Sequence, residues 1–285
     1  MAIKRVGVVG SGIMGSGLAE VAAKSGFEVV LRSRAQSTAD AMIAGLEKSL
    51  TKQVERGKLA DEERTAVLGR VQAVSDLGEL AECDLVIESI VEDLQTKKHL
   101  FTELDRICKE GAILATNTST LPVVEMAMNT GRPDSVCGIH FFNPAPMMAL
   151  VEVVRAITTS DDTIAAATEF ATTCGKNPVQ VKDQAGFIVN ALLFPYLNNA
   201  VRLLDAGVAT RDDIDTAMKG GCNFPMGPLE LLDLVGLDTS LSIIEALYAE
   251  FKDANYAPAP LLRRMVSAER LGRKTSSGFY DYHRK

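Results

Sequence analysis

The sequence predicts an α/β fold, with a mostly parallel sheet in a first domain and an all-α second domain. Short apolar runs alternate with amphipathic helical patterns as far as Lys182, which is typical of a parallel sheet with crossover helices. Beyond that residue the patterns are helical, are separated by Gly and Pro, and include no strand pattern. We therefore expect a sheet domain over residues 1–182 and a helical domain over residues 183–285.

A glycine-rich turn is the first strong signal in the chain. The apolar strand Ile3–Val9 runs directly into it, and a helical pattern follows and stops at Gly26. Glycines at the first, third and sixth positions make the tight turn, let a pyrophosphate approach, and pack helix against strand. The sequence therefore predicts a Rossmann-type dinucleotide-binding domain whose turn contributes Gly10, Ser11, Gly12, Ile13, Met14 and Gly15.

The end of the next strand, Glu28–Leu31, predicts which dinucleotide is bound. An NAD enzyme normally places an acid here to bind the ribose 2′-hydroxyl, but this chain has Arg32, Ser33 and Arg34. Two guanidinium groups beside a hydroxyl suit a 2′-phosphate, so we expect NADP to be favoured. NAD stays possible if the arginines lie in solvent or stack on adenine.

The other elements continue the pattern in order. In the first domain we expect helices over 35–56, after Asp61, and over 94–107 and 161–173, and strands at 71–74, 85–90, 112–116, 136–140, around Glu152 and near 177–181. In the second domain we expect helices over 186–204, 212–218, 229–234, 240–251 and 261–268.

Polar side chains follow the strands that end near Thr116 and His140. The carboxyl ends of such strands form the edge where open α/β sheets bind ligands. Imidazole titrates nearest neutral pH of all side chains, and Glu152, between two valines, needs a partner for a buried charge. We predict that His140 is a general base paired with Glu152; the alternative is a structural histidine.

Composition limits the possible partners. A net charge of −7 and a pI near 5.2 argue against nucleic acid, although Lys48, Lys52, Arg56 and Lys58 form a local basic cluster that suits either a solvated helix face or a phosphate-rich substrate. The chain has no apolar run of bilayer length and no apparent signal peptide, so we expect a cytoplasmic protein without membrane contact. Five scattered cysteines predict neither disulfides nor a metal site.

Seven spaced motifs resemble the 3-hydroxyacyl-CoA dehydrogenases over the whole chain, and most of all the stand-alone 3-hydroxybutyryl-CoA dehydrogenases. The motifs are the glycine turn, Asn117-Thr118-Ser119, His140-Phe141-Phe142-Asn143-Pro144, Leu150-Val151-Glu152-Val153-Val154, Gly186-Phe187-Ile188-Val189-Asn190, Pro225-Met226-Gly227-Pro228 and Gly278-Phe279-Tyr280. The resemblance implies hydride transfer between an acyl-CoA and NAD(P).

The resemblance also implies roles for individual residues. His140 corresponds to the catalytic base and Glu152 to its carboxylate, while Ser119 and Asn190 correspond to groups that hold the reacting oxygen. Positions that line the cofactor correspond to Glu92, Lys97, Asn117, Ser119, Asn143 and Lys274, and positions near the CoA correspond to Ser49 and Arg56. Departures from the family pattern occur at Ser33, Ala149, Ala185, Ala191 and Ser276, of which only Ser33 affects the expected cofactor.

Two other functions stay open from the sequence. One is a dehydrogenase of a β-hydroxy acid without CoA, and the other is an idle dinucleotide-binding protein. The basic cluster favours the acyl-CoA enzyme, because a free acid would not need it. The helical domain has more Leu, Ile and Val than it can easily bury alone, so we expect a homodimer through that domain.

Overall fold

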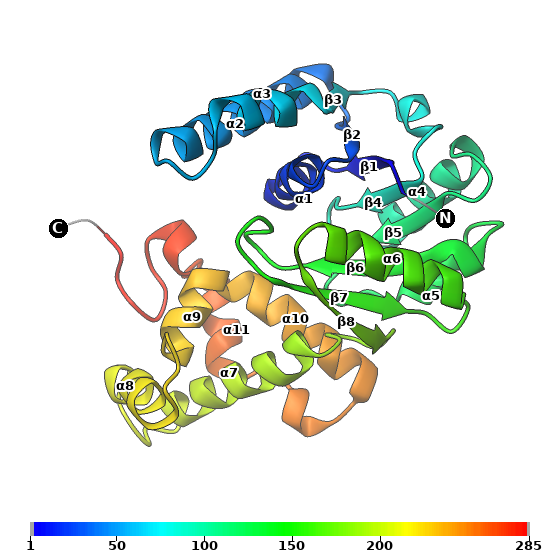
Figure 1. Cartoon of the computed structure of the whole chain (residues 1–285). Helices are drawn as coiled ribbons and strands as arrows, with labels where there is room; N and C mark the ends of the chain where they lie inside the picture. The colour runs from blue at the N-terminus through cyan, green and yellow to red at the C-terminus, as the bar shows by residue number, and fades with distance from the viewer. Residues whose placement is uncertain (1–2, 284–285) are drawn as a thin grey trace. The chain divides into compact units, whose positions relative to one another are not determined.

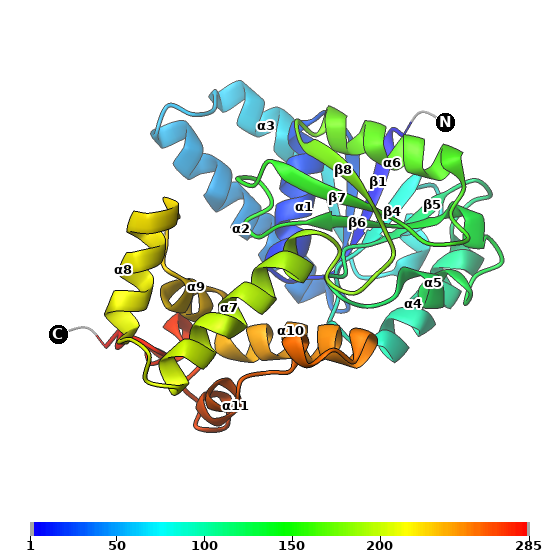
Figure 2. The ribbon, with the colours of Figure 1, turned by 90° about the horizontal axis from the view of Figure 1, so that it is seen from below.

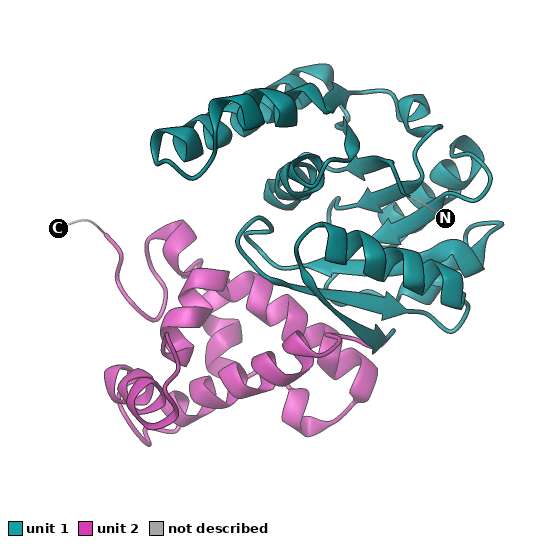
Figure 3. Cartoon of the chain, viewed as in Figure 1, with its two compact units in different colours: residues 1–183 teal, residues 184–285 magenta. Residues whose placement is uncertain are grey.

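The structure is a computed structural model that describes residues 3–283. The chain divides into two compact units, a first that ends at Asp183 and a second that begins at Gln184 (Figure 3). The first unit contains a mostly parallel sheet with helices, and the second is helical (Figure 1), which confirms the predicted fold class. The separate roles that the sequence suggests for the two parts stay predictions.

Eight strands form one sheet in the order β3-β2-β1-β4-β5-β6-β7-β8. Neighbouring strands are parallel except for β6 and β7, which are antiparallel. Residues 142–149 join these two strands, and so short a connection cannot make the crossover that a parallel pair requires. The strands are β1 (Arg5–Val9), β2 (Glu28–Arg32), β3 (Val71–Val74), β4 (Leu85–Glu88), β5 (Ile113–Thr116), β6 (Val136–Phe141), β7 (Leu150–Arg155) and β8 (Asn177–Lys182).

Helices of the first unit cover both sides of this sheet. One core cluster joins apolar residues of α1, α2 and α6 to the strands, and within it the ring centroids of Phe27 and Phe170 lie 5.2 Å apart. α4 and α5 pack on each other and against β5 and β6, on the side away from α6 (Figure 2). The helices are α1 (Ile13–Lys24), α2 (Gln36–Glu55), α3 (Asp61–Gly69), α4 (Leu94–Ile107), α5 (Val123–Ala127) and α6 (Asp161–Thr173).

The described residues of the second unit, 184–283, form five α-helices that pack around an apolar core of their own. Its first helix begins at Val189, three residues later than expected, because Gly186 and Phe187 have φ values of +74° and +49° that a helix cannot contain. Within residues 3–283, no helix is both long and apolar enough to cross a membrane. The helices are α7 (Val189–Asp205), α8 (Arg211–Cys222), α9 (Pro228–Val235), α10 (Leu237–Phe251) and α11 (Pro260–Ser267).

Two buried carboxylates explain the glycines in the last two motifs. Asp215 accepts hydrogen bonds from the first backbone N–H groups of α9, and a Cβ on Gly227 would lie 2.2 Å from its Cγ. Asp233 accepts bonds from the backbone of Phe279 and Tyr280, and a Cβ on Gly278 would lie 2.0 Å from its Oδ1. Both motifs therefore serve the packing of the second unit.

Close packing of β6 on β7 predicts a stability effect at Gly138. A Cβ at this position would lie 2.7 Å from Cβ of Val154, so Gly138→Ala should lower the free energy of unfolding by about 1–3 kcal/mol through overpacking. Urea denaturation would measure the change. Gly45→Ala in α2, whose Cβ would meet no atom within 4 Å, is the matched control and should be neutral or stabilising. Equal stability of the two variants would contradict this account.

Candidate active site

A histidine and a glutamate face each other across the antiparallel pair β6 and β7. His140 and Glu152 are register partners, and Nδ1 of the imidazole lies 2.7 Å from Oε2 of the carboxylate. Their side chains are only 5% and 0% exposed. A carboxylate can only accept, so Nδ1 carries the proton and Nε2 of a neutral ring is left as an acceptor. Burial thus fixes both the ring orientation and the tautomer.

The third member of the group comes from the loop after β5. The hydroxyl oxygen of Ser119 lies 3.1 Å from Nε2 of His140, where it can donate to the neutral ring. The result is a line of hydrogen bonds from Ser119 through His140 to Glu152. This is the geometry of a general base with an orienting carboxylate. The structure therefore brings together three of the four residues predicted to be catalytic.

Two asparagines follow the strands β5 and β6 that carry this line of hydrogen bonds. Oδ1 of Asn117 accepts a 2.8 Å bond from the backbone N–H of Phe141, which ties the end of β5 to the end of β6. Asn143 follows β6 and is exposed, while the ring of Phe142 lies 4.5 Å from that of His140. Asn117 is thus occupied in part by the backbone, whereas the side chain of Asn143 is accessible.

Asn190 and Lys274 belong to the second unit. Asn190 is buried, at 7% exposure, in the first turns of α7, and Lys274 forms an ion pair with Asp238 at the start of α10. Their contributions to the reaction stay predictions.

A cavity of about 490 Å³ opens beside the glycine turn. A Cβ on Gly10 would lie 2.2 Å from the carbonyl oxygen of Ser89, and one on Gly15 would lie 2.1 Å from that of Gly10. Gly12, in contrast, has no atom within 4 Å of its Cβ position, so its backbone is open to a ligand. Two glycines serve close packing and one leaves room, as a turn that binds a dinucleotide pyrophosphate requires.

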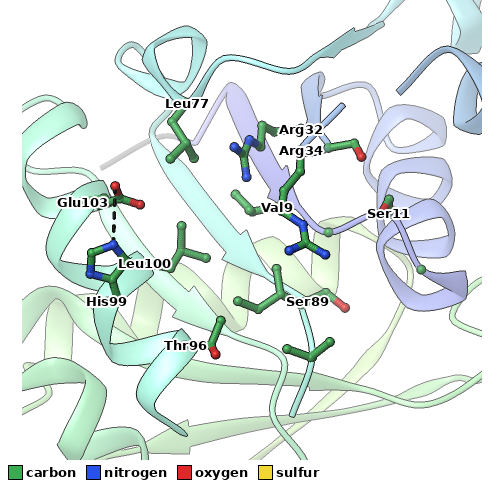
Figure 4. Close-up of a pocket in the computed structure, with 15 residues that line it drawn as sticks. Val9, Ser11, Arg32, Arg34, Leu77, Ser89, Thr96, His99, Leu100 and Glu103 are labelled. Atoms are coloured by element: carbon green, nitrogen blue, oxygen red, sulfur yellow. Dashed lines mark ion pairs between the residues drawn. The ribbon is translucent and has the colours of Figure 1, made fainter. Parts of the chain in front are cut away.

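Two arginines and one glutamate line opposite sides of this cavity (Figure 4). Arg32 is the last residue of β2 and Arg34 follows the strand, while His99 and Glu103 come from α4. Nε2 of His99 lies 3.7 Å from Oε1 of Glu103. Nε of Arg32 donates to the carbonyl of Ser75 at 3.1 Å. Burial lowers the pKa of this guanidinium, and Glu103 opposes that effect. Arg34 is exposed, so it is the arginine better able to meet a ligand.

The sequence interpretation missed the wall that α4 contributes to the cavity. Thr96, His99, Leu100 and Glu103 line it together with Leu77. The four α4 residues follow helical spacing along one face, so the amphipathic pattern of the helix contained the signal. What the pattern does not reveal is which face meets the glycine turn.

Lys97, which the family resemblance places along the cofactor, is buried in the structure. Its side chain is 1% exposed, with Nζ 2.5 Å from Oε1 of Glu88 and 3.3 Å from Oε2 of Glu92. The ammonium of Lys97 is therefore ion-paired with both carboxylates, whereas the side chain of Glu92 is 41% exposed. Glu92 is therefore accessible to a ligand, and a direct contact between Lys97 and the cofactor stays a prediction.

The residues predicted to lie near the CoA are on α2 and just after it. The hydroxyl of Ser49 donates to Oε2 of buried Glu20 at 3.3 Å, so it is partly occupied between α1 and α2. Arg56 caps the end of α2 and is exposed, as are Lys48, Lys52 and Lys58. The basic cluster is therefore open to solvent. Among the described residues, no three His, Cys, Asp or Glu side chains are grouped to hold a metal ion.

A dinucleotide-type glycine turn and a histidine paired with a glutamate, at one edge of a mostly parallel sheet, are typical of nicotinamide-dependent dehydrogenases. Residues 5–184 match the 3-hydroxyacyl-CoA dehydrogenase NAD binding domain, and residues 186–282 match the C-terminal domain of the same enzymes. The chain belongs to the 3-hydroxyacyl-CoA dehydrogenase family, which confirms the predicted resemblance.

Relatives of similar length support this membership. A 3-hydroxybutyryl-CoA dehydrogenase of Clostridioides difficile is 48% identical over 98% of this chain and 100% of its own, and the mitochondrial hydroxyacyl-coenzyme A dehydrogenase of Sus scrofa is 43% identical over 98% and 91%. Among solved structures, Mycobacterium tuberculosis FadB2 has a TM-score of 0.96 at 47% identity, with 99% and 100% of the two chains covered. The (S)-3-hydroxybutyryl-CoA dehydrogenase PaaH1 of Ralstonia eutropha has a TM-score of 0.97 at 41% identity, with the same coverage.

Proposed function

We propose that this protein interconverts 3-hydroxyacyl-CoA and 3-oxoacyl-CoA, with the four-carbon 3-hydroxybutyryl-CoA as its substrate. The observation that carries the proposal is the line of hydrogen bonds from Ser119 through His140 to Glu152. An idle binding protein would gain nothing from a buried carboxylate aimed at an imidazole. Family membership and the names of the relatives support the acyl-CoA substrate.

In the oxidation, the chain's own residues move one proton. Nε2 of His140 takes the proton of the substrate hydroxyl. The carboxylate of Glu152, which accepts the hydrogen bond from Nδ1–H of His140, stabilises the imidazolium that results. The Ser119 hydroxyl, 3.1 Å from Nε2, is placed to bond to the reacting oxygen. In the reduction His140 returns the proton to that oxygen.

The residues around the cavity fit a nicotinamide dinucleotide. The open backbone of Gly12 and the N-terminus of α1 suit its pyrophosphate, and Arg32, Ser33 and Arg34 suit its adenosine ribose. When bound, the nicotinamide accepts or supplies the hydride that accompanies the proton transfer. Exposed Glu92 and Asn143 are assigned to the same ligand.

Loss of the base should slow the chemical step. His140→Ala should lower kcat with acetoacetyl-CoA by about a hundredfold or more, the usual scale for a general acid or base, while dinucleotide binding persists. Glu152→Gln should also be slow, because the imidazolium loses its counter-charge. Steady-state kinetics and dinucleotide titration would measure the two effects. Near-normal turnover by His140→Ala would remove His140 from the mechanism.

The exposed basic cluster predicts how CoA is recognised. Arg56→Ala should raise KM for acetoacetyl-CoA, most strongly at low salt where a phosphate contact is least screened, and should leave kcat unchanged. Arg106→Ala, which removes an exposed arginine of α4, is the control for net charge and should have no such effect. An equal rise in KM for a substrate analogue without CoA would show that Arg56 supports the fold.

We also propose that NADP is the preferred dinucleotide. Ser33 removes the repulsion that an acid would exert on a 2′-phosphate, and exposed Arg34 is free of the backbone bond that occupies Arg32. One charge-assisted hydrogen bond contributes about 1.5–3 kcal/mol, which corresponds to roughly tenfold or more in affinity. The carboxylate of Glu103 in the same cavity acts in the opposite direction.

Cofactor kinetics would test this preference directly. With acetoacetyl-CoA as substrate, kcat/KM should be higher with NADPH than with NADH, and Ser33→Asp should reverse the order because it restores the acid. Arg34→Ala should weaken the binding of NADPH and leave the binding of NADH unchanged, so NADH is the internal control. Equal or better rates with NADH in the unaltered protein would refute the preference for NADP.

Exposed leucines on α7 support the proposal of a homodimer through the second unit. Leu192 and Leu203 are 72% and 47% exposed and lie three helical turns apart on one face. Leu192→Asp should convert a dimer to a monomer in light scattering, since burying an unpaired charge in an interface is costly. Ile157→Asp, at a position 93% exposed in the first unit, should leave the mass unchanged. A monomeric unaltered protein would end this proposal.

A further inference from the structure

Five polar residues form a closed ring of contacts, through four side-chain contacts and one backbone N–H, at the carboxyl ends of β4 and β5. We call it the Glu88 ring, and it consists of Glu88, Lys97, Glu92, Thr118 and Thr116. Lys97 bridges the two glutamates, and the hydroxyl of Thr118 donates to Oε1 of Glu92. The hydroxyl of Thr116 accepts from the backbone N–H of Thr118 at 3.1 Å and donates to Oε2 of Glu88 at 2.8 Å, which closes the ring.

Most of the ring is shielded from water. Glu88 and Thr116 are 0% exposed, Lys97 and Thr118 are 1% exposed, and Glu88 and Thr116 are register partners in the sheet. A buried ion pair often contributes little net stability, because desolvation offsets the Coulomb attraction. The placement of two charges under the sheet edge therefore calls for a role other than holding the fold together.

The ring leads directly to the hydroxyl that contacts the base. Oε1 of Glu92 accepts the backbone N–H of Ser119 at 2.9 Å as well as the Thr118 hydroxyl. That hydroxyl in turn accepts from the N–H of Leu121 at 3.0 Å. Residues 118–121 are thus held at several points, and the Ser119 hydroxyl lies 3.1 Å from Nε2 of His140. Displacing Glu92 would release the backbone on which this hydroxyl sits.

We propose that Glu88 and Lys97 are positioning residues that hold Glu92, and through it the Ser119 hydroxyl, against His140. The ammonium of Lys97 is buried between the two carboxylates, where its charge holds Glu92 in place. The effect on turnover rests on the proposed dehydrogenase function, whereas the effect on His140 does not. Misplacement of a catalytic group by about 1 Å can cost on the order of a hundredfold in rate, so such support is worth having.

A double-mutant cycle separates positioning from general destabilisation. Lys97→Met should lower kcat with acetoacetyl-CoA roughly tenfold or more, with a change of less than about threefold in the dinucleotide Kd. In a Ser119→Ala background the same change should have little further effect, because the group that it positions is already gone. Lys98→Met is the matched control, since the neighbouring lysine pairs with Glu125 outside the ring and should leave kcat unchanged.

Two further variants guard against misfolding. Glu88→Gln combined with Lys97→Met removes both buried charges and leaves no lone carboxylate at the end of β4. Thr118→Val keeps the shape of a side chain that is 1% exposed and removes the hydroxyl that donates to Glu92 and accepts from the backbone N–H of Leu121. Both should reproduce the loss of kcat with circular dichroism like that of the unaltered protein.

Histidine NMR provides a test that does not depend on turnover. The chain has three histidines, so the ring signals of His140 can be assigned by substitution. Lys97→Met and Thr118→Val should shift the His140 ring signals in the direction that Ser119→Ala shifts them, and Lys98→Met should not. Unshifted signals, additive effects in the cycle, or a dinucleotide Kd that rises as much as kcat falls would each overturn the proposal. If the signals shift while the unaltered protein does not turn over acetoacetyl-CoA, the positioning role stands and the proposed reaction fails.

Discussion

The buried carboxylate of Glu152 is the constraint on which the active site depends. A charge with no exposed surface requires a close partner, and the antiparallel register of β6 and β7 supplies His140 directly opposite. The antiparallel direction follows from the short connection of residues 142–149, which forbids a parallel crossover. A single reversal in an otherwise parallel sheet thereby fixes the orientation of the imidazole and the tautomer that leaves Nε2 as an acceptor.

The same sheet edge brings together parts that are far apart in the sequence. The parallel strands β1, β4 and β5 end side by side. The glycine turn, the Glu88 ring and the loop of Ser119 therefore lie at the same edge of the sheet. Each strand contributes a different chemical property: open backbone after β1, buried charge at β4, and a hydroxyl after β5. The antiparallel pair then contributes the imidazole of His140 and the carboxylate of Glu152. Rigid strands place these groups more accurately than free loops could.

Sequence reasoning predicted what depends on local pattern and could not predict what depends on partner choice. Strand and helix periods identified the fold class, and a carboxylate between two valines required a partner, which His140 provides. The start of α7 was wrong because positive φ values at Gly186 and Phe187 have no signature in hydrophobic periodicity. The burial of Lys97 and the cavity wall formed by Glu103 depend on which helix face meets the sheet edge. That contact is a property of the tertiary structure, and it involves residues distant in the chain.

Cofactor choice shows the same dependence on distant residues. Read from β2 alone, Arg32, Ser33 and Arg34 form a simple phosphate site, but the cavity also contains Glu103 from α4. Arg32 donates a hydrogen bond to the carbonyl of Ser75, and the carboxylates of Glu103 and Asp76 partly balance its charge. Attraction of a 2′-phosphate therefore depends mainly on Arg34, set against one carboxylate across the cavity. Because Coulomb energy between exposed charges is small at a few ångströms in water and grows as water is excluded, the outcome depends on how fully the bound nucleotide covers Arg34.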